Sequence, residues 1–513
     1  MTSQNVASVL EDFLSQSNNA VVIEDGAVVL DLAQTKYSVS GEKNKCLRHL
    51  WSPERNVVRR VLDLERKGDA LRITVQKIGQ ARPTKLEICR ERDRRTATSK
   101  RAARLGYQRV LERALKRHFP DFTMAQLTTS IDLEKSFGPI YARGFVKRGQ
   151  SAFAVLGVNR EELQASIDAA LTFGILWLDV CRQTHAGKLV FEGLKLFIPD
   201  GCSEIVRARM AHLNTKIAKW RLYELEERSE ELKSIEIGDR GNISTRLVRC
   251  VDEAQVLGRF EAPSALVKTI MPEVEVGVIS AAEISFRCYG LEFARARLSA
   301  KPGQFLSEPE IVFGIGAHER ILEGNNFAHF ERLVRGVAEV RHAEGPSDNK
   351  YWRLHPERWL ESLVVKNICA LDDQFDRRWR YSQVPAFSAS DRAMIDVLTL
   401  TRDGRLAVLE LKADEDIHLP LQGIDYWTRV AWHHSRGEFQ KFGYFDGYEL
   451  SPRSPLLVMV APALRVHPAT DTLLHYISPE IEWTLVGIGE LWRKEIKVVF
   501  RKRSSKSQFK AAG

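Results

Sequence analysis

The stretch Asp396-Val-Leu-Thr-Leu-Thr-Arg-Asp-Gly-Arg-Leu-Ala-Val-Leu-Glu410-Leu-Lys412 decides the fold of the C-terminal part of this chain. Two apolar runs, Val397 to Leu400 and Leu406 to Leu411, flank Arg402-Asp403-Gly404, which is a turn signal. This order predicts a β-hairpin. Its open end carries three charged residues that a hydrophobic core would not select.

The length of the loop decides whether these charges lie on one face, because a shift of one residue moves every side chain to the other face. A two-residue loop would place Asp396 opposite Leu411. A three-residue loop, with Gly404 in the left-handed region as a bulge, places Asp396 opposite Glu410. Glu410 and Lys412 already share a face, since side chains repeat with period two. We therefore predict the three-residue loop.

The three charged residues have the chemistry of a metal site. Two carboxylates at a strand end, with a main-chain carbonyl nearby, suit a hard divalent cation such as Mg²⁺ (or Mn²⁺), and a metal-bound water is then a nucleophile. Lys412 would orient or deprotonate that water, or neutralise charge developing on a phosphate. The sequence leaves these roles open.

With Asp396, Glu410 and Lys412 in this order, the chain resembles the PD-(D/E)XK, or restriction-endonuclease-like, nuclease superfamily. The resemblance implies that Asp396 and Glu410 are metal ligands and that Lys412 is catalytic. Ile395 stands where the family often has Pro.

Two flanking segments extend the resemblance to about residues 351 to 465. Upstream, Pro356 to Val364 has a helix start and helical apolar spacing, and Glu361 matches a Glu that the family brings to the metal or its water shell. Downstream, Gln422 and Tyr426 share one helical face and resemble a Gln-x-x-x-Tyr element. In that branch the Gln touches the nucleophile region and the Tyr approaches the nucleic-acid backbone.

Nearby histidines are weaker candidates for a metal site. His433 and His434 are adjacent and so point to different sides of a helix, and His418 has no Cys or His at a closing distance. We expect packing or surface roles for all three.

Composition sets the class of the protein. The chain has 513 residues, 44% hydrophobic and 28% charged, which indicates several globular domains rather than disorder. Seven dispersed cysteines favour reduced thiols. No signal peptide is visible, and the apolar segment Ala169 to Leu178 is too short to span a bilayer. We expect a cytoplasmic protein with no membrane partner.

The net charge of +9 favours a polyanionic partner. Residues 90 to 117 contain eleven Lys or Arg residues against three acidic ones. Within this segment, Arg101 and Arg104 are candidate contacts to nucleic-acid phosphates. The chain also ends in a basic tail, residues 501 to 513, for which a solvated tail is an equal interpretation.

The expected fold class is multidomain α/β (α+β), with a C-terminal restriction-endonuclease-like core of a mixed central sheet flanked by helices. We expect helix over 201 to 235. The predicted divisions are a strand-rich module at 1–85, an α/β domain at 86–200, a mixed domain at 201–343, the nuclease domain at 350–500 and the tail at 501–513.

An internal similarity leads to a hypothesis of duplication. Phe153-Ala-Val-Leu-Gly157-Val-Asn159 resembles the run from Leu406 to Lys412. The 86–200 domain would then be a degenerate second copy with Gly157 and Asn159 in place of Glu410 and Lys412, and with Tyr141 or Arg143 in place of Asp396. Such a copy could not hold a metal. Different strand orders in the two segments would refute the hypothesis.

The sequence therefore predicts a Mg²⁺-dependent deoxyribonuclease that cuts phosphodiester bonds, with DNA as substrate and either a homodimer or a partner protein of a defence or repair system. One alternative is a non-catalytic nucleic-acid-binding or scaffold protein that keeps the fold. Another is a nuclease subunit that is active only within a larger assembly. The chain has no Walker phosphate loop.

Overall fold

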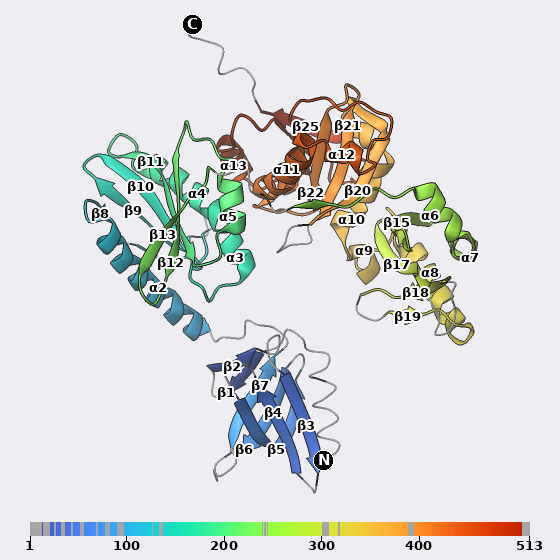
Figure 1. Cartoon of the computed structure of the whole chain (residues 1–513), viewed down its shortest axis with the longest axis horizontal. Coiled ribbons are helices and arrows are strands. Elements are labelled where there is room, and N and C mark those ends of the chain that lie inside the picture. The colour runs from blue at the N-terminus through green and yellow to red at the C-terminus, as the bar shows by residue number, and fades with distance from the viewer. Residues whose placement is uncertain are drawn as a thin grey trace. The chain divides into compact units, whose positions relative to one another are not determined.

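The computed structural model describes Phe13 and residues 21–24, 27–31, 36–42, 45–51, 56–67, 70–76, 83–89, 97–125, 127–132, 137–238, 240, 243, 245–299, 307–316, 319–387 and 394–504. The chain divides into two units, Met1–Gly106 and Tyr107–Gly513. Mixed and antiparallel sheets flanked by helices make the protein a multidomain α/β protein, as predicted (Figure 1).

The N-terminal unit holds an antiparallel sheet with the order β2-β1-β7-β6-β5-β4-β3. Its strands are β1 (Val21–Glu24), β2 (Ala27–Asp31), β3 (Lys36–Glu42), β4 (Lys45–Trp51), β5 (Asn56–Lys67), β6 (Ala70–Gln76) and β7 (Thr84–Cys89). Alternate residues of β6, such as Leu71, Ile73 and Val75, are buried, which is the pattern of a strand with one covered face.

The second unit begins with a mixed sheet in the order β13-β12-β11-β10-β9-β8. Its strands are β8 (Thr123–Met124), β9 (Ala142–Arg148), β10 (Ser151–Gly157), β11 (Val190–Pro199), β12 (Lys219–Glu226) and β13 (Glu231–Ile235). The accompanying helices are α2 (Ala97–His118), α3 (Gln164–Asp168), α4 (Ala170–Thr184) and α5 (Glu204–Met210). Strands β10, β11 and β12 are parallel, and the remaining pairs are antiparallel.

A C-terminal mixed sheet has the order β14-β20-β21-β22-β23-β24-β25. Its strands are β14 (Arg246–Leu247), β20 (Phe375–Phe387), β21 (Met394–Thr401), β22 (Leu406–Leu411), β23 (Leu456–Pro462), β24 (Trp483–Ile488) and β25 (Val498–Arg503). Its helices are α9 (Lys350–Arg353), α10 (Pro356–Lys366), α11 (Leu419–Ser435), α12 (Glu438–Lys441) and α13 (Thr470–His475), with short 3-10 turns η3 (Ile368–Ala370) and η4 (Ala463–Arg465).

The two mixed sheets share strand order and strand direction, so the strand order does not refute the duplication hypothesis. We call the two segments copies in the sense of that hypothesis. Strands β22, β23 and β24 are parallel, as are β10, β11 and β12, and an antiparallel strand flanks each set on both sides. A crossover helix, α4 or α11, joins the first two parallel strands in each. The two crossover helices share one hydrophobic core. Leu171 and Ile175 of α4 belong to the same buried cluster as Leu421 and Ile424 of α11.

The segment between the two copies holds a fourth sheet, in the order β15-β16-β17-β18-β19. Its elements are β15 (Glu275–Ser280), β16 (Glu283–Cys288), β17 (Leu291–Ser299), β18 (Glu308–Phe313), β19 (Arg320–Ile321), α6 (Glu253–Arg259), α7 (Glu261–Ile270), η2 (Gly324–Asn326) and α8 (Phe327–Val340). Phe330, Val334 and Val337 of α8 are buried against the sheet, as expected for an apolar stripe at helical spacing. We call this part the β15–β19 module.

Two sequence expectations differ from the structure. The helix expected over 201 to 235 is only α5, followed by strands β12 and β13, because the alternating residues Trp220 and Leu222 bury on one face of the sheet. The sheet therefore continues past residue 200, where we placed a domain boundary. Likewise Arg501–Arg503 belong to edge strand β25 rather than to a tail, while residues 505–513 lie outside the described residues.

One described helical segment, Gln164–Thr184, is long and apolar enough by composition to cross a membrane, with 56% of its most apolar window buried. Its residues Ala170, Ile175 and Leu178 pack into the core shared by the two copies. Burial in this core accounts for its apolar composition.

Candidate active site

The hairpin β21–β22 confirms the predicted register. Val397 pairs with Leu409 and Leu400 with Leu406, so the next pair along the ladder is Asp396 with Glu410. The loop is Arg402 to Gly404, closed by a hydrogen bond from Thr401 N to Arg405 O of 2.8 Å, and Gly404 has φ of 79°. A Cβ at Gly404 would lie 2.8 Å from the carbonyl oxygen of Glu449, so conformation and space both require glycine.

The two carboxylates lie at the end of this hairpin. Asp396 Oδ2 accepts a hydrogen bond from the backbone N–H of Leu411 at 3.0 Å. Glu410 is 1% exposed, and no donor reaches its buried oxygen Oε2. Burial, followed by the negative charge of Asp396, raises the pKa of Glu410 well above its ordinary value. The pKa of Asp396 is also raised, chiefly by burial.

Lys412 provides the positive charge at this site. Its Nζ lies 3.1 Å from Glu410 Oε1, and 3.7 Å from both Glu357 Oε1 and Asp416 Oδ2. Burial alone would lower the pKa of Lys412, but Glu410 and Glu357 oppose it, and the net result is a raised pKa. The amine therefore stays protonated, which favours an electrostatic role over that of a general base.

Glu361 comes from α10, the helix that begins at Pro356. Its Oε2 accepts hydrogen bonds from Arg358 Nη1 at 2.9 Å and from Gln383 Nε2 at 2.7 Å. The side chain is buried, and burial raises its pKa to about 8, although the charge of Arg358 opposes the shift. Gln383 holds this contact from a left-handed conformation with φ of 52°, a strained geometry for a residue in a strand.

These side chains border a cavity of about 680 Å³ whose walls come from α10, β21, β22 and α11. Asp396, Glu410, Lys412, Glu361 and Tyr426 all line it. The structure thus brings together five of the residues singled out from sequence. Burial, with the charge of Glu410, raises the pKa of the Tyr426 hydroxyl, so that it remains a hydrogen-bond donor.

The remaining candidate site residues do not line this cavity. Gln422 lies one turn before Tyr426 on α11 but does not line the cavity, and its side-chain oxygen is buried with no donor. Arg104 lies on α2 within the N-terminal unit and is partly buried. The backbone of Arg101 belongs to the same helix, and its side chain lies outside the described residues.

The donor set fits a hard divalent cation in part. Asp396 and Glu410 present carboxylate oxygens on one face, and the orphaned Oε2 of Glu410 has the chemistry of a ligand atom. Among the described residues, however, no group of three or more His, Cys, Asp or Glu residues is arranged to hold a metal ion. A cation at this place would need a main-chain oxygen or water to complete its shell.

The nearby histidines have other partners. His418 Nδ1 lies 2.9 Å from Thr172 Oγ1, and His433 lies 2.5 Å from Glu438 Oε2 and 3.1 Å from Thr245 Oγ1. These contacts join helices and loops, which agrees with the packing roles expected for these side chains.

Sequence analysis missed His355, Arg358 and Met394, which line this cavity, and Gln383, which hydrogen-bonds to Glu361 from β20. Arg358 carried a local signal, since it stands three residues before Glu361 on the same helix. Gln383 carried none, because its strand reaches Glu361 only through the tertiary fold.

The first copy has no carboxylate at the matching positions. Val158 N donates to Phe197 O at 3.1 Å, just as Lys412 N donates to Val460 O at 2.9 Å, so Val158 matches Lys412 and Leu156 matches Glu410. Leu156 pairs with Arg143, which therefore matches Asp396.

The predicted alignment of Gly157 with Glu410 is thus wrong by one residue. Gly157 lies on the opposite face, where a Cβ would meet Tyr107 Oη at 2.4 Å. Arginine and two apolar side chains are not ligands for a divalent cation.

Comparisons with known proteins add little. No family model matches the chain, and no curated protein matches it. A repair endonuclease from Pyrococcus abyssi, known from its crystal structure, is similar over 40% of this chain and 91% of that chain, with 11% sequence identity and a TM-score of 0.14. A similarity of this size supports no conclusion about function.

Proposed function

We propose that this chain is a metal-dependent nuclease that hydrolyses phosphodiester bonds in DNA, with its active site at Asp396, Glu410 and Lys412. The observation that carries the proposal is the burial of Glu410 beside Asp396, with an oxygen that no donor satisfies and Lys412 Nζ at 3.1 Å. Buried carboxylates that repel one another destabilise a fold, so a cluster of this kind indicates a functional site.

Each residue has a role that follows from its geometry. Asp396 and Glu410 would hold Mg²⁺ or Mn²⁺, which when bound lowers the pKa of water and polarises the phosphate. Protonated Lys412 donates to a phosphate oxygen and stabilises the charge that develops there. As the water oxygen bonds to phosphorus, the bond to the leaving sugar oxygen breaks; the water gives a proton to solvent, and the leaving oxygen takes one up from solvent to become a hydroxyl.

Two further features support a nucleic acid as the substrate. The chain carries a net charge of +9, which favours a polyanion. Tyr426 lines the same cavity with a protonated hydroxyl that can donate to a backbone phosphate. Cys202, Cys250, Cys288 and Cys369 are free thiols, which supports the proposal of a cytoplasmic protein.

Cleavage of labelled single-stranded, duplex and forked DNA with Mg²⁺ or Mn²⁺ tests the proposal. Glu410→Gln should abolish metal-dependent cleavage while DNA binding persists, because the substitution keeps the shape and removes a ligand charge. Glu415→Gln, a half-exposed carboxylate just beyond Lys412, is the matched control and should cut normally. Binding without any cleavage by the wild-type chain would favour a non-catalytic binding protein or a subunit that needs an assembly.

A further inference from the structure

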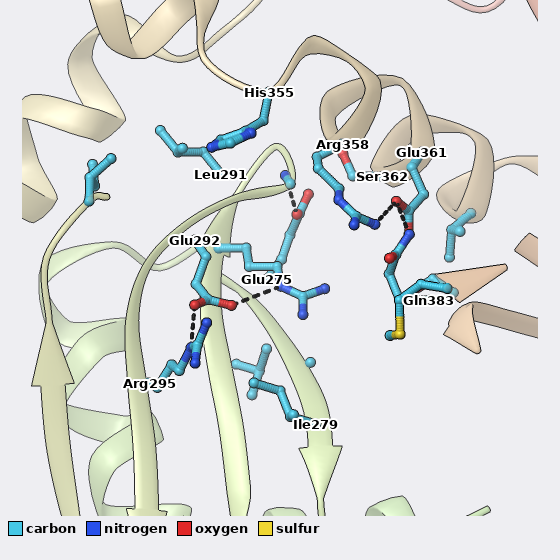
Figure 2. Close-up of a pocket in the computed structure, with 18 of the residues that line it drawn as sticks. Glu275, Ile279, Leu291, Glu292, Arg295, His355, Arg358, Glu361, Ser362 and Gln383 are labelled. Atoms are coloured by element: carbon cyan, nitrogen blue, oxygen red, sulfur yellow. Dashed lines mark hydrogen bonds and ion pairs between the residues drawn. The ribbon is translucent and has the colours of Figure 1, made fainter. Parts of the chain in front are cut away.

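A second cavity, of about 640 Å³, lies between the β15–β19 module and α10. Figure 2 shows Glu275, Glu292 and Arg295 on the strands of the module, facing Arg358 and Glu361 of α10 across the opening. Its volume lies within the range of roughly 300 to 1,000 Å³ that is usual for small-molecule sites. We call it the module cleft.

The walls of the module cleft are fixed to one another by Arg341, which is fully buried. Its guanidinium donates to Cys288 O at 2.9 Å and Tyr289 O at 2.9 Å in the module, and to Leu354 O at 2.8 Å just before α10. Gly290, with φ of 70°, packs so closely that a Cβ would lie 2.1 Å from Arg358 O. Such contacts make the cleft a built feature rather than a loose gap between domains.

The module cleft and the active-site cavity share four residues, His355, Arg358, Glu361 and Met394. Arg358 connects the two cavities, because its side chain lines both of them and hydrogen-bonds to Glu361. A strand whose phosphate lies at Glu410 and Lys412 would therefore have a neighbouring nucleotide within reach of the cleft.

The lining of the module cleft has the chemistry of a site that binds nucleobases rather than of a groove that follows the phosphate backbone. Val276, Ile279, Leu291 and Ile315 form an apolar wall. Arg287 and Arg295 offer donors, and Glu292, which pairs with both, offers acceptors. A groove that follows only the backbone would be lined by cations alone, whereas nucleobases present apolar faces with donors and acceptors on their edges.

We propose that the module cleft binds the base of a nucleotide, and that in the working enzyme this nucleotide belongs to the strand held at the active site. The identification of the strand rests on the proposed nuclease function, whereas the base-binding chemistry does not. A free nucleotide carries the same chemistry and is the other source of the ligand.

Binding is measured with the full-length chain in EDTA, so that no cleavage is needed. The probes are a fluorescein-labelled single-stranded DNA, a strand of equal length in which every position is abasic, and the four deoxynucleoside monophosphates. The variants are Arg295→Gln and Arg287→Gln. Arg297→Gln is the matched control, since it removes the same charge from the strand that carries Arg295, β17, but does not line the cleft.

The wild-type chain should prefer the base-bearing strand over the abasic strand by about tenfold or more, the discrimination expected when an arginine reads a base edge. Arg295→Gln and Arg287→Gln should remove most of this preference, and Arg297→Gln should keep it. Affinity for the abasic strand should match that of the control in every variant, which also shows that the variants are folded.

Other results overturn the proposal. If the wild-type chain shows no preference for the base-bearing strand, the cleft does not bind bases. If the variants lose as much affinity for the abasic strand as for the base-bearing strand, the cleft binds the phosphate backbone instead. If no strand binds but the monophosphates do, and Arg295→Gln loses them, the base-binding site stands while the nuclease proposal fails. If neither strands nor monophosphates bind, both proposals fail.

Discussion

Replacing Glu361 with glutamine should make the metal-free protein more stable, by an amount that grows with pH. The carboxyl has an ordinary pKa of 4.5 when exposed in the unfolded chain, and burial raises the pKa to about 8 in the fold. Between these values the folded chain holds a proton that the unfolded chain has lost. Stability therefore falls as pH rises through this window.

The size of the effect follows from the width of the window. Each pH unit between the two pKa values removes about 1.4 kcal/mol of unfolding free energy, so at pH 7 the wild-type chain is less stable by about 3 kcal/mol than a chain without this carboxyl. Glutamine keeps the shape and can still accept from Arg358 and Gln383. At pH 5 the difference should shrink below about 1 kcal/mol.

Urea unfolding in EDTA at pH 5, 6, 7 and 8, followed by tryptophan fluorescence, measures the difference. Trp359 lies two residues before Glu361 and is fully buried, so its environment changes when this region unfolds. Glu480→Gln, an exposed carboxylate, is the control and should show no pH-dependent difference. Parallel pH profiles for the wild type and Glu361→Gln would refute the reasoning, because they would mean that Glu361 is ionised in the fold.

Three further substitutions test other parts of the structure. Lys412→Met should lower cleavage by about a hundredfold or more, because a positioned charge is lost, and a single-turnover rate that stays at the wild-type value would contradict this role. Gly404→Ala should destabilise the protein by about 1 to 3 kcal/mol, since a Cβ meets Glu449 O at a positive φ, and an unchanged unfolding midpoint would contradict the loop geometry. Asp425→Asn should cost about 3 to 5 kcal/mol, because buried Arg209 loses the carboxylate that it contacts at 2.7 Å between the two copies; thermal unfolding would show the loss, and a small effect would mean that water solvates Arg209.

The hairpin and its charges could be predicted from the sequence because their determinants are local. Gly404 sets the loop, the loop sets the register, and the period of two then places Asp396, Glu410 and Lys412 on one face. The helix bearing Glu361 could be predicted for the same reason, since Pro356 and the apolar spacing lie within a few residues.

The hypothesis of duplication shows how far local sequence similarity can be used. The order of elements in the first copy was correct, yet the alignment of Gly157 with Glu410 was wrong by one residue. In an apolar strand buried on both faces, such as Ser151–Gly157, every position is hydrophobic or small, so the sequence does not show which residues face the crossover helix. Only the hydrogen bond from Val158 to Phe197 and the packing of α4 against Leu156 decide it.

By itself, the sequence determined the α/β class, the β21–β22 hairpin and the candidate carboxylates, since each depends on residues close together in the chain. The tertiary structure alone decided that Gln383 and Arg358 hold Glu361, that Arg143 lies opposite Leu156 in the first mixed sheet, and that the β15–β19 module forms a cleft beside the candidate active site. These contacts join segments tens or hundreds of residues apart. Their geometry depends on the packing of whole sheets and helices, which no local pattern encodes.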